Sequence, residues 1–143
     1  MTNHFAEVNF FVYGTLKRRE CREHMWPRSP LVVEDAWIHG ELYDTGSYPA
    51  LVPGTDKVLG ELWTFAASDF EAVARVLDEI EEYRPLDPYN LYNLYNREVV
   101  ECETASGRRA LAQTYIYARL KDLPAFTRLA PSEPHAFTQW RSA

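Results

Sequence analysis

The sequence predicts an α+β fold with a mostly antiparallel or barrel-like β-sheet and one main helix. Three observations support this fold class: there are many short runs with strand character, one segment is strongly helical, and strands and helices hardly alternate. The 143 residues have the length of one domain, and no linker divides residues 1–143. A domain of this length buries roughly 68–70% of its extended surface, which is enough for a core and one enclosed pocket.

The expected strands are apolar runs bounded by turn-forming residues. Residues 9–14, NFFVYG, predict a buried strand that ends in a turn. Two similar segments, GELY at 40–43 and GELW at 60–63, follow runs of strand character, and the turn formers between them predict a long connection. Two more strands are expected at 96–104 and 109–120 around the turn ASGRR.

Three other segments are expected to be irregular. Residues 17–30 are charged and contain two prolines, which favours a loop or one short helix. The repeat PYNLYNLYN at 88–96 lacks helical amphipathicity and predicts a loop, either a lid or a contact surface. The chain from Lys121 onward carries three prolines and is expected to wrap irregularly around the surface.

The segment SDFEAVARVLDEIEEY, residues 68–83, predicts the main helix. Ser68 followed by Glu71 has the spacing of a capping box, in which each side chain bonds the other's backbone N–H. Pro85 is expected to stop the helix, because proline lacks the N–H that a helix needs.

One of the four carboxylates in LDEIEEY, residues 77–83, is expected to face the core. At about 100° per residue, Glu81 falls at about 40° from Leu77, inside the apolar stripe. Asp78, Glu79 and Glu82 fall at roughly 100°, 200° and 140°, which predicts that they are solvated. The rest of the stripe consists of Phe70, Val73, Ala74 and Ile80.

The predicted position of Glu81 favours a raised pKa. Apolar neighbours desolvate the carboxylate, and the negative end of the helix dipole also disfavours its charge. A glutamate whose pKa lies near neutrality can accept and return a proton, so Glu81 is a candidate general acid/base. Two other interpretations stay open: Glu81 extends to solvent, or it pairs with Arg84 or Arg97. Arg97 is equally a candidate partner for a substrate carboxylate.

The segment VYGTLK at 12–17 is a second candidate site. A strand that ends in Gly followed by Thr lets consecutive backbone N–H groups point to one spot, and such a nest binds carboxylates or phosphates. Gly14 would also permit close approach of a ligand. The spacing is not that of a P-loop, and an ordinary turn explains the same residues.

Composition excludes several classes of function. The net charge of −6 argues against nucleic acid as a partner, because phosphate contacts need a basic face. No signal peptide or membrane span is apparent, so a cytoplasmic protein without a membrane partner is expected. Cys21 and Cys102 do not suggest a disulfide framework, and Cys21 with His24 lacks the second pair that a metal site needs.

The ordered motifs resemble those of the gamma-glutamylcyclotransferase family, especially its small bacterial and gamma-glutamylamine cyclotransferase-like branch. The segments are VYGTLK, GELYDTGSYPAL, VLGELWTF, LDEIEEY and YNREVV, and together they span about residues 8 to 117. The resemblance implies a small mixed, mostly antiparallel β-barrel with one main helix and a cavity at one mouth. It also implies a small-molecule gamma-glutamyl substrate, no cofactor and no metal; the oligomeric state stays open.

The resemblance also implies roles for individual residues. Glu81 occupies the position of the family's catalytic acid/base, the same residue that helical periodicity selects. The turn after the first strand holds the glutamyl end of the substrate through backbone groups, which corresponds here to Tyr13, Gly14, Thr15 and Leu16. Tyr95 matches a tyrosine of the pocket that opens the strand after the helix, and Tyr115 is a weaker match.

The reaction that the resemblance implies is intramolecular aminolysis, which converts a gamma-glutamyl amine or amino acid into 5-oxoproline and a free amine. One departure stands out: the family's usual glycine after the catalytic glutamate is Glu82 here. A glycine there serves either close approach or a helix C-cap, so the substitution leaves the identity of the released amine open. Two alternatives remain: a lyase acting on another gamma-glutamyl conjugate, and a non-catalytic module that binds a small acidic ligand or a partner in the same cavity.

Overall fold

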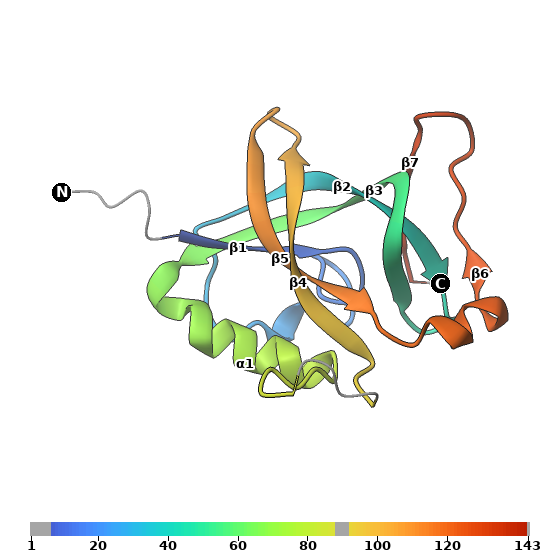
Figure 1. The fold of residues 1–143 in the computed structure, drawn as a ribbon. Coiled ribbons are helices and arrows are strands. Elements are labelled where there is room, and N and C mark those ends of the chain that lie inside the picture. Colours follow the sequence, from blue (N-terminus) through green and yellow to red (C-terminus); the bar gives the residue numbers. More distant parts are fainter. Residues whose placement is uncertain (1–6, 88–91, 143) are drawn as a thin grey trace.

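The computed structural model describes residues 7–87 and 92–142, and the strands among them close into a five-stranded β-barrel (Figure 1). The barrel strands are β1 (Glu7–Val12), β2 (Val32–Asp44), β3 (Pro49–Ala66), β4 (Tyr95–Thr104) and β5 (Arg109–Tyr117). The order β2-β4-β5-β1-β3 closes because β2 also pairs with β3. Around the barrel β1 and β5 are parallel and the other neighbours are antiparallel. The predicted mixed, mostly antiparallel barrel is confirmed.

The remaining elements flank this barrel. They are the 3-10 helices η1 (Glu23–Met25), η2 (Ala67–Asp69) and η3 (Leu120–Ala125), the helix α1 (Phe70–Ile80), and the short strands β6 (Thr127–Arg128) and β7 (Phe137–Thr138). The strand β6 pairs with β2, and β7 pairs with β3. Figure 1 shows α1 lying along one side of the barrel, below the strands β1, β4 and β5. No helix in the described residues is long and apolar enough to span a membrane.

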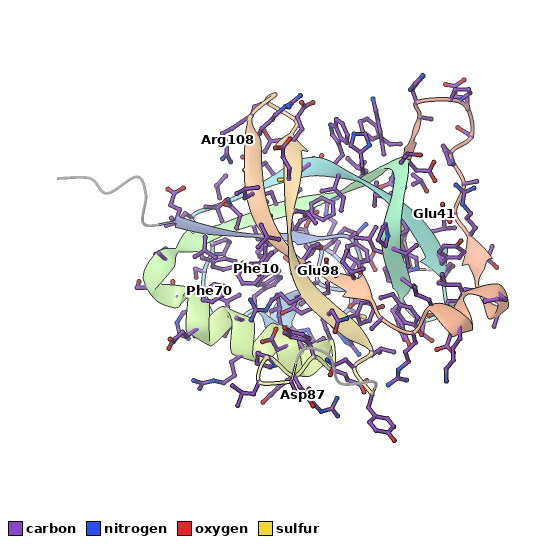
Figure 2. All side chains as sticks on the ribbon, in the orientation of Figure 1. Phe10, Glu41, Phe70, Asp87, Glu98 and Arg108 are labelled. Carbon is purple, nitrogen blue, oxygen red and sulfur yellow. The ribbon has the colours of Figure 1, made fainter. Side chains whose placement is uncertain are left out.

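The apolar run in β1 supplies both faces of the sheet with core residues. Phe10 belongs to the cluster that packs against α1, where its ring stacks on Phe70 with centroids 6.1 Å apart (Figure 2). Phe11 points to the opposite face and belongs to a second cluster with Leu62. Successive side chains of a strand alternate between faces, so a strand covered on both sides is apolar at consecutive positions.

The connection between β2 and β3 is shorter than the sequence predicts. The chain reverses over Thr45–Tyr48, where the N–H of Thr45 donates to the carbonyl oxygen of Tyr48 at 3.0 Å. The later turn formers, residues 53–55, lie inside β3 opposite the step from Gly40 to Glu41, where the pairing register shifts. The predicted long connection is therefore wrong, because a bulge accommodates a proline and a glycine within a continuing strand.

The start of α1 also differs from the prediction. Ser68 lies in the 3-10 turn before the helix, and Asp69 occupies the N-cap without a side-chain capping bond. The predicted capping box of Ser68 with Glu71 is wrong. The carboxylate of Asp69 instead forms an ion pair with Arg28, with 3.4 Å between the nitrogen and oxygen atoms.

Gly60 of β3 packs directly against the end of β1. A Cβ atom built on this residue would lie 2.7 Å from the Cζ atom of Phe11 and even closer to the backbone carbonyl oxygen of Val12. Backbone atoms of a closed barrel cannot move aside cheaply, so this position requires glycine.

We predict that Gly60→Ala lowers the free energy of unfolding by about 1–3 kcal/mol, the usual cost of overpacking. The measurement is urea unfolding of the purified variant. Val99→Ala, at an exposed strand position, is the control and should cost less than about 1 kcal/mol. If the two variants are equally stable, the barrel tolerates a Cβ atom at position 60 and the position does not require glycine.

Candidate active site

A cavity of about 100 Å³ lies where the C-terminal end of α1 meets the turn that follows β1. Its size suits several waters or the head group of a small ligand. The described residues that line it are Phe11, Val12, Tyr13, Gly14, Thr15, Leu16, Arg22, Tyr48, Pro49, Ile80, Glu81, Glu82, Leu94, Tyr95 and Tyr115. Glu81 and the turn at 13–16, which the sequence selects separately, therefore share one cavity.

Glu81 is the C-cap residue of α1, and its N–H donates to the carbonyl oxygen of Leu77 at 2.9 Å. Burial of the carboxyl group raises its pKa from 4.5 to about 7. The guanidinium of Arg22 acts in the opposite direction and lowers this pKa, while the carboxylate of Glu82 raises it. Desolvation is the largest of the three effects, so Glu81 can change its protonation state near neutral pH.

The arginines considered as partners of Glu81 bind elsewhere. Arg84 donates to the side-chain oxygen of Asn93 at 3.0 Å. Arg97 pairs with Asp78, with 2.9 Å between Nε and Oδ1. Within the described part of the chain, the carboxylate of Glu81 forms no ion pair with any cation.

Asp78 is buried, which corrects the prediction that it is solvated. Its Oδ1 accepts a hydrogen bond from the hydroxyl of Tyr115 at 2.6 Å as well as one from Arg97. Arg97 also donates to the side-chain oxygen of Gln113 at 3.0 Å. Helical periodicity places Asp78 outside the apolar stripe, but β4 and β5 bring Arg97 and Tyr115 to that flank of the helix. The group joins α1 to both strands, so we treat it as structural.

The helix ends before Pro85, the stop that the sequence predicts, because Glu82 turns the backbone out of the helix. Glu82 has φ 53°, in the left-handed region. Its N–H donates to the carbonyl of Glu79 at 3.2 Å, and the N–H of Tyr83 donates to that of Asp78 at 2.9 Å. These two bonds form a Schellman motif, whose left-handed position is usually glycine. The C-cap explanation of the family's glycine therefore agrees with the backbone here.

The turn after β1 presents unused backbone donors. Within the described residues, the N–H groups of Gly14, Thr15 and Leu16 donate to no protein acceptor. The carbonyls of this turn are occupied: that of Gly14 accepts from the N–H of Lys17 at 3.1 Å, and that of Thr15 accepts from the N–H of Arg22 at 2.8 Å. Three consecutive free donors on a cavity wall can bind an anionic oxygen.

The absence of a side chain at Gly14 serves packing. A Cβ atom there would lie 2.7 Å from Cγ and 2.8 Å from Cδ of Pro49. Close contact with the Pro49 ring, which is another wall of the cavity, is therefore one reason for glycine here, and close approach of a ligand to its backbone stays a prediction.

Three of the four described tyrosines that line the cavity, Tyr13, Tyr95 and Tyr115, are neutral phenols with raised pKa values. The hydroxyl of Tyr13 donates to the carbonyl oxygen of Tyr115, and that of Tyr95 donates to the carbonyl oxygen of Pro49. Burial raises the pKa of Tyr13, Tyr95 and Tyr115 above the ordinary value of 10.0, and the nearby Glu81 raises all three further. These side chains form part of the cavity wall. Because they stay uncharged, they do not compensate the charge of Glu81, which therefore stays in a poorly solvated environment.

Sequence reasoning missed Arg22, which lines the cavity and is partly exposed. It lies in the segment expected as a loop or short helix, and no periodicity or motif marks it. Its place in the site depends on the bond between its backbone and Thr15. Among the described residues, no cluster of three or more His, Cys, Asp or Glu is placed to hold a metal, and Cys21 is an exposed free thiol.

Comparisons with known proteins agree with one another. A family model described as gamma-glutamyl cyclotransferase, AIG2-like, matches residues 10–140. A gamma-L-glutamyl-butirosin B gamma-glutamyl cyclotransferase from Niallia circulans is 36% identical over 114 residues, which are 78% of this chain and 67% of the relative. The gamma-glutamylcyclotransferase family protein YtfP of Escherichia coli strain K12 is 32% identical over 56 residues, and this alignment covers 39% of the chain and 50% of YtfP.

Two solved structures share the fold. An AIG2-like protein from Mus musculus has a TM-score of 0.57 at 22% identity, and the match covers 96% of this chain and 98% of the mouse protein. YkqA from Bacillus subtilis has a TM-score of 0.60 at 24% identity; the match covers 85% of this chain but only 37% of YkqA. At these identities the two comparisons show a shared fold and nothing further.

We predict that Glu82→Gly raises the free energy of unfolding relative to Glu82→Gln by about 0.5–1 kcal/mol, because glycine adopts the left-handed conformation without a Cβ clash. Both variants remove the same charge, so their difference isolates the backbone effect. Urea unfolding at one pH measures it. A glycine variant that is less stable than the glutamine variant would show that φ 53° carries no cost here.

We also predict that Glu81 makes stability depend on pH. The folded protein keeps the Glu81 proton up to about pH 7, whereas the unfolded chain releases it near 4.5. Because the native state then binds more protons, stability falls as pH rises through this window. The cost is absent below the lower pKa and complete above the higher one.

Glu81→Gln removes this cost, so the variant should be more stable than the native sequence at about pH 8, by at most about 3 kcal/mol. The difference should shrink toward zero near pH 4.5, the ordinary pKa of the side chain. Urea unfolding across this range measures it. A constant difference at every pH would mean that the carboxyl group is solvated.

Proposed function

The chain belongs to the gamma-glutamyl cyclotransferase, AIG2-like family, and from this premise we propose that it converts a gamma-glutamyl amine or gamma-glutamyl amino acid into 5-oxoproline and a free amine. One observation carries the proposal: a carboxyl group with a pKa of about 7, that of Glu81, lines the same cavity as three unpaired backbone N–H groups. The named cyclotransferase of Niallia circulans supports an enzyme of this type.

The proposed reaction is an intramolecular displacement. The α-amine of the substrate attacks its own γ-carbonyl carbon, a new C–N bond forms, and the C–N bond to the leaving amine breaks. Water and redox equivalents are not consumed. Because the nucleophile and the electrophile are tethered in one molecule, proximity already favours ring closure. The enzyme has to hold the extended substrate in a folded conformation and to move protons.

Glu81 is proposed to move those protons. In its ionised form it accepts a proton from the α-amine, which cannot attack as an ammonium. It then delivers the proton to the nitrogen of the leaving amine, since an amide nitrogen leaves poorly unless it is protonated. The second proton, which the ring nitrogen loses as the lactam forms, leaves with the released amine as its ammonium ion. A pKa near 7 suits both steps, because a group titrating at the operating pH is neither too weak a base nor too weak an acid.

The turn after β1 is proposed to hold the oxygen atoms. The free N–H groups of Gly14, Thr15 and Leu16 bind an anionic oxygen of the substrate, either its α-carboxylate or the γ-carbonyl oxygen as negative charge develops on it. The neutral phenols of Tyr13 and Tyr95 form part of the surrounding wall. A module that only bound an acidic ligand would gain nothing from a desolvated carboxylate beside that ligand.

We predict that Glu81→Gln lowers 5-oxoproline formation by about 10²–10⁴-fold, the usual contribution of a general acid/base. The assay supplies a panel of gamma-glutamyl amines, gamma-glutamyl amino acids and glutathione, and follows 5-oxoproline by mass spectrometry. For the native protein, kcat/KM should rise with pH up to the pKa of about 7 and then level off, because the ionised form is the base.

Glu79→Gln is the matched control, because Glu79 lies on the exposed side of α1 and outside the cavity. Its activity should equal that of the native protein. The proposal fails if the native protein forms 5-oxoproline from no compound of the panel, or if the Glu81→Gln protein remains fully active.

A further inference from the structure

Arg22 carries a positive charge that the protein itself leaves unpaired. Of the described residues that line the cavity, it is the one cation, and its guanidinium forms no ion pair or hydrogen bond within the described part of the chain. A guanidinium presents five donors in a planar fork that matches a carboxylate. If it bound no ligand, the guanidinium of Arg22 would only lower the pKa of Glu81 and so make Glu81 a weaker base.

Two other arginines of this part of the molecule are already engaged. Arg97 contacts Asp78 and Gln113, and Arg18 contacts Glu61 and Asp35. These side chains are held by protein acceptors and are not available to a ligand. The alternative left open by the sequence, that Arg97 binds a substrate carboxylate, therefore loses its support.

The backbone places Arg22 next to the free donors. Its N–H donates to the carbonyl oxygen of Thr15 at 2.8 Å, and its own carbonyl accepts from the N–H of Met25 at 3.0 Å. The first bond joins the start of η1 to the turn after β1, and the second closes η1 itself, so the guanidinium extends from a hydrogen-bonded backbone. Its charge reaches Glu81, whose pKa it lowers.

We propose that the guanidinium of Arg22 binds the α-carboxylate of the gamma-glutamyl group and thereby restricts the enzyme to substrates whose α-carboxylate is free. The inference rests on the proposed function and names the substrate class for the same site. It also assigns the free N–H groups of Gly14, Thr15 and Leu16 to the γ-carbonyl oxygen, where charge develops during ring closure.

The same contact between Arg22 and the α-carboxylate makes Glu81 a stronger base. The groups that act on Glu81 or that it acts on are Arg22, Glu82 and the phenols of Tyr13, Tyr95 and Tyr115. When the α-carboxylate neutralises Arg22, the influence that lowers the pKa of Glu81 is cancelled. Glu81 then becomes a stronger base at the moment when it must take a proton from the adjacent α-ammonium.

The test compares two matched substrates, a gamma-glutamyl amine with a free α-carboxylate and the same compound as its α-carboxamide. The native protein should prefer the free acid by about 100-fold in kcat/KM, as expected for a lost charge-assisted hydrogen bond. Arg22→Gln should lose this preference through a lower kcat/KM for the acid and an unchanged value for the amide. Arg22→Lys should recover part of it, since a lysine supplies charge without the fork.

The variants need a control and a pH profile. Arg75→Gln removes the same charge from the exposed side of α1 and should keep the full preference. Rates are compared on the plateau above the pKa of Glu81, because Arg22→Gln is expected to raise that pKa. A merely structural role of Arg22 would lower the rates for both substrates equally, and this result would overturn the proposal.

A binding experiment separates this inference from the proposed function. Calorimetric titration with 5-oxoproline and with its carboxamide needs no turnover. The native protein should bind the acid more tightly, and Arg22→Gln should bind both alike. This result supports Arg22 even if no gamma-glutamyl compound is turned over, which would refute only the proposed function. If Arg22→Gln still prefers the acid, the backbone N–H groups bind the carboxylate and the proposal is wrong.

Discussion

A carboxyl group held at the end of a helix without a cation in contact is the constraint on which this site depends. Charge is disfavoured there by burial, and the carbonyl ends of α1 offer no compensation. The molecule accepts this unfavourable arrangement at Glu81 while it pairs the neighbouring buried carboxylate of Asp78 fully with Arg97 and Tyr115. The contrast between the two acids, one fully hydrogen-bonded and one not, distinguishes a structural group from the proposed general acid/base.

The barrel provides the rigidity that such an arrangement needs. In the closed barrel β1 lies between β3 and β5 and pairs with both, so the turn after β1 emerges at a fixed place. The hydrogen bonds of Asp78 with Arg97 and Tyr115 join α1 to β4 and β5. Glu82 ends the helix in a hydrogen-bonded turn directly after Glu81. The hydroxyl of Tyr13 bonded to the backbone of Tyr115 joins the two sides of the cavity. Each contact limits how far the carboxyl group can move toward water.

The two arginines near the site differ in the same way. The guanidinium of Arg97 is hydrogen-bonded to protein acceptors and lies over the rings of Phe70 and Tyr83. Arg22 lines the cavity, and the donors of its guanidinium are free within the described residues. The protein as a whole carries a net charge of −6, so the unpaired guanidinium of Arg22 in the cavity is a local exception to an acidic molecule. Among the described lining residues, a ligand that brings its own carboxylate would meet this cation, three backbone donors and the neutral phenols.

The sequence by itself determined the strands, the main helix, the inward direction of Glu81 and the turn at Gly14. These features depend on periodicity and on local turn chemistry, which act over a few residues. The motif order also indicated the family, which the match over residues 10–140 confirms. Only the tertiary structure decided that Asp78 is buried, that Arg97 belongs to it and that Arg22 reaches the cavity. Those outcomes depend on which distant strands cover a helix flank: Tyr115 meets Asp78 across 37 positions of sequence, and helical periodicity carries no information about that approach.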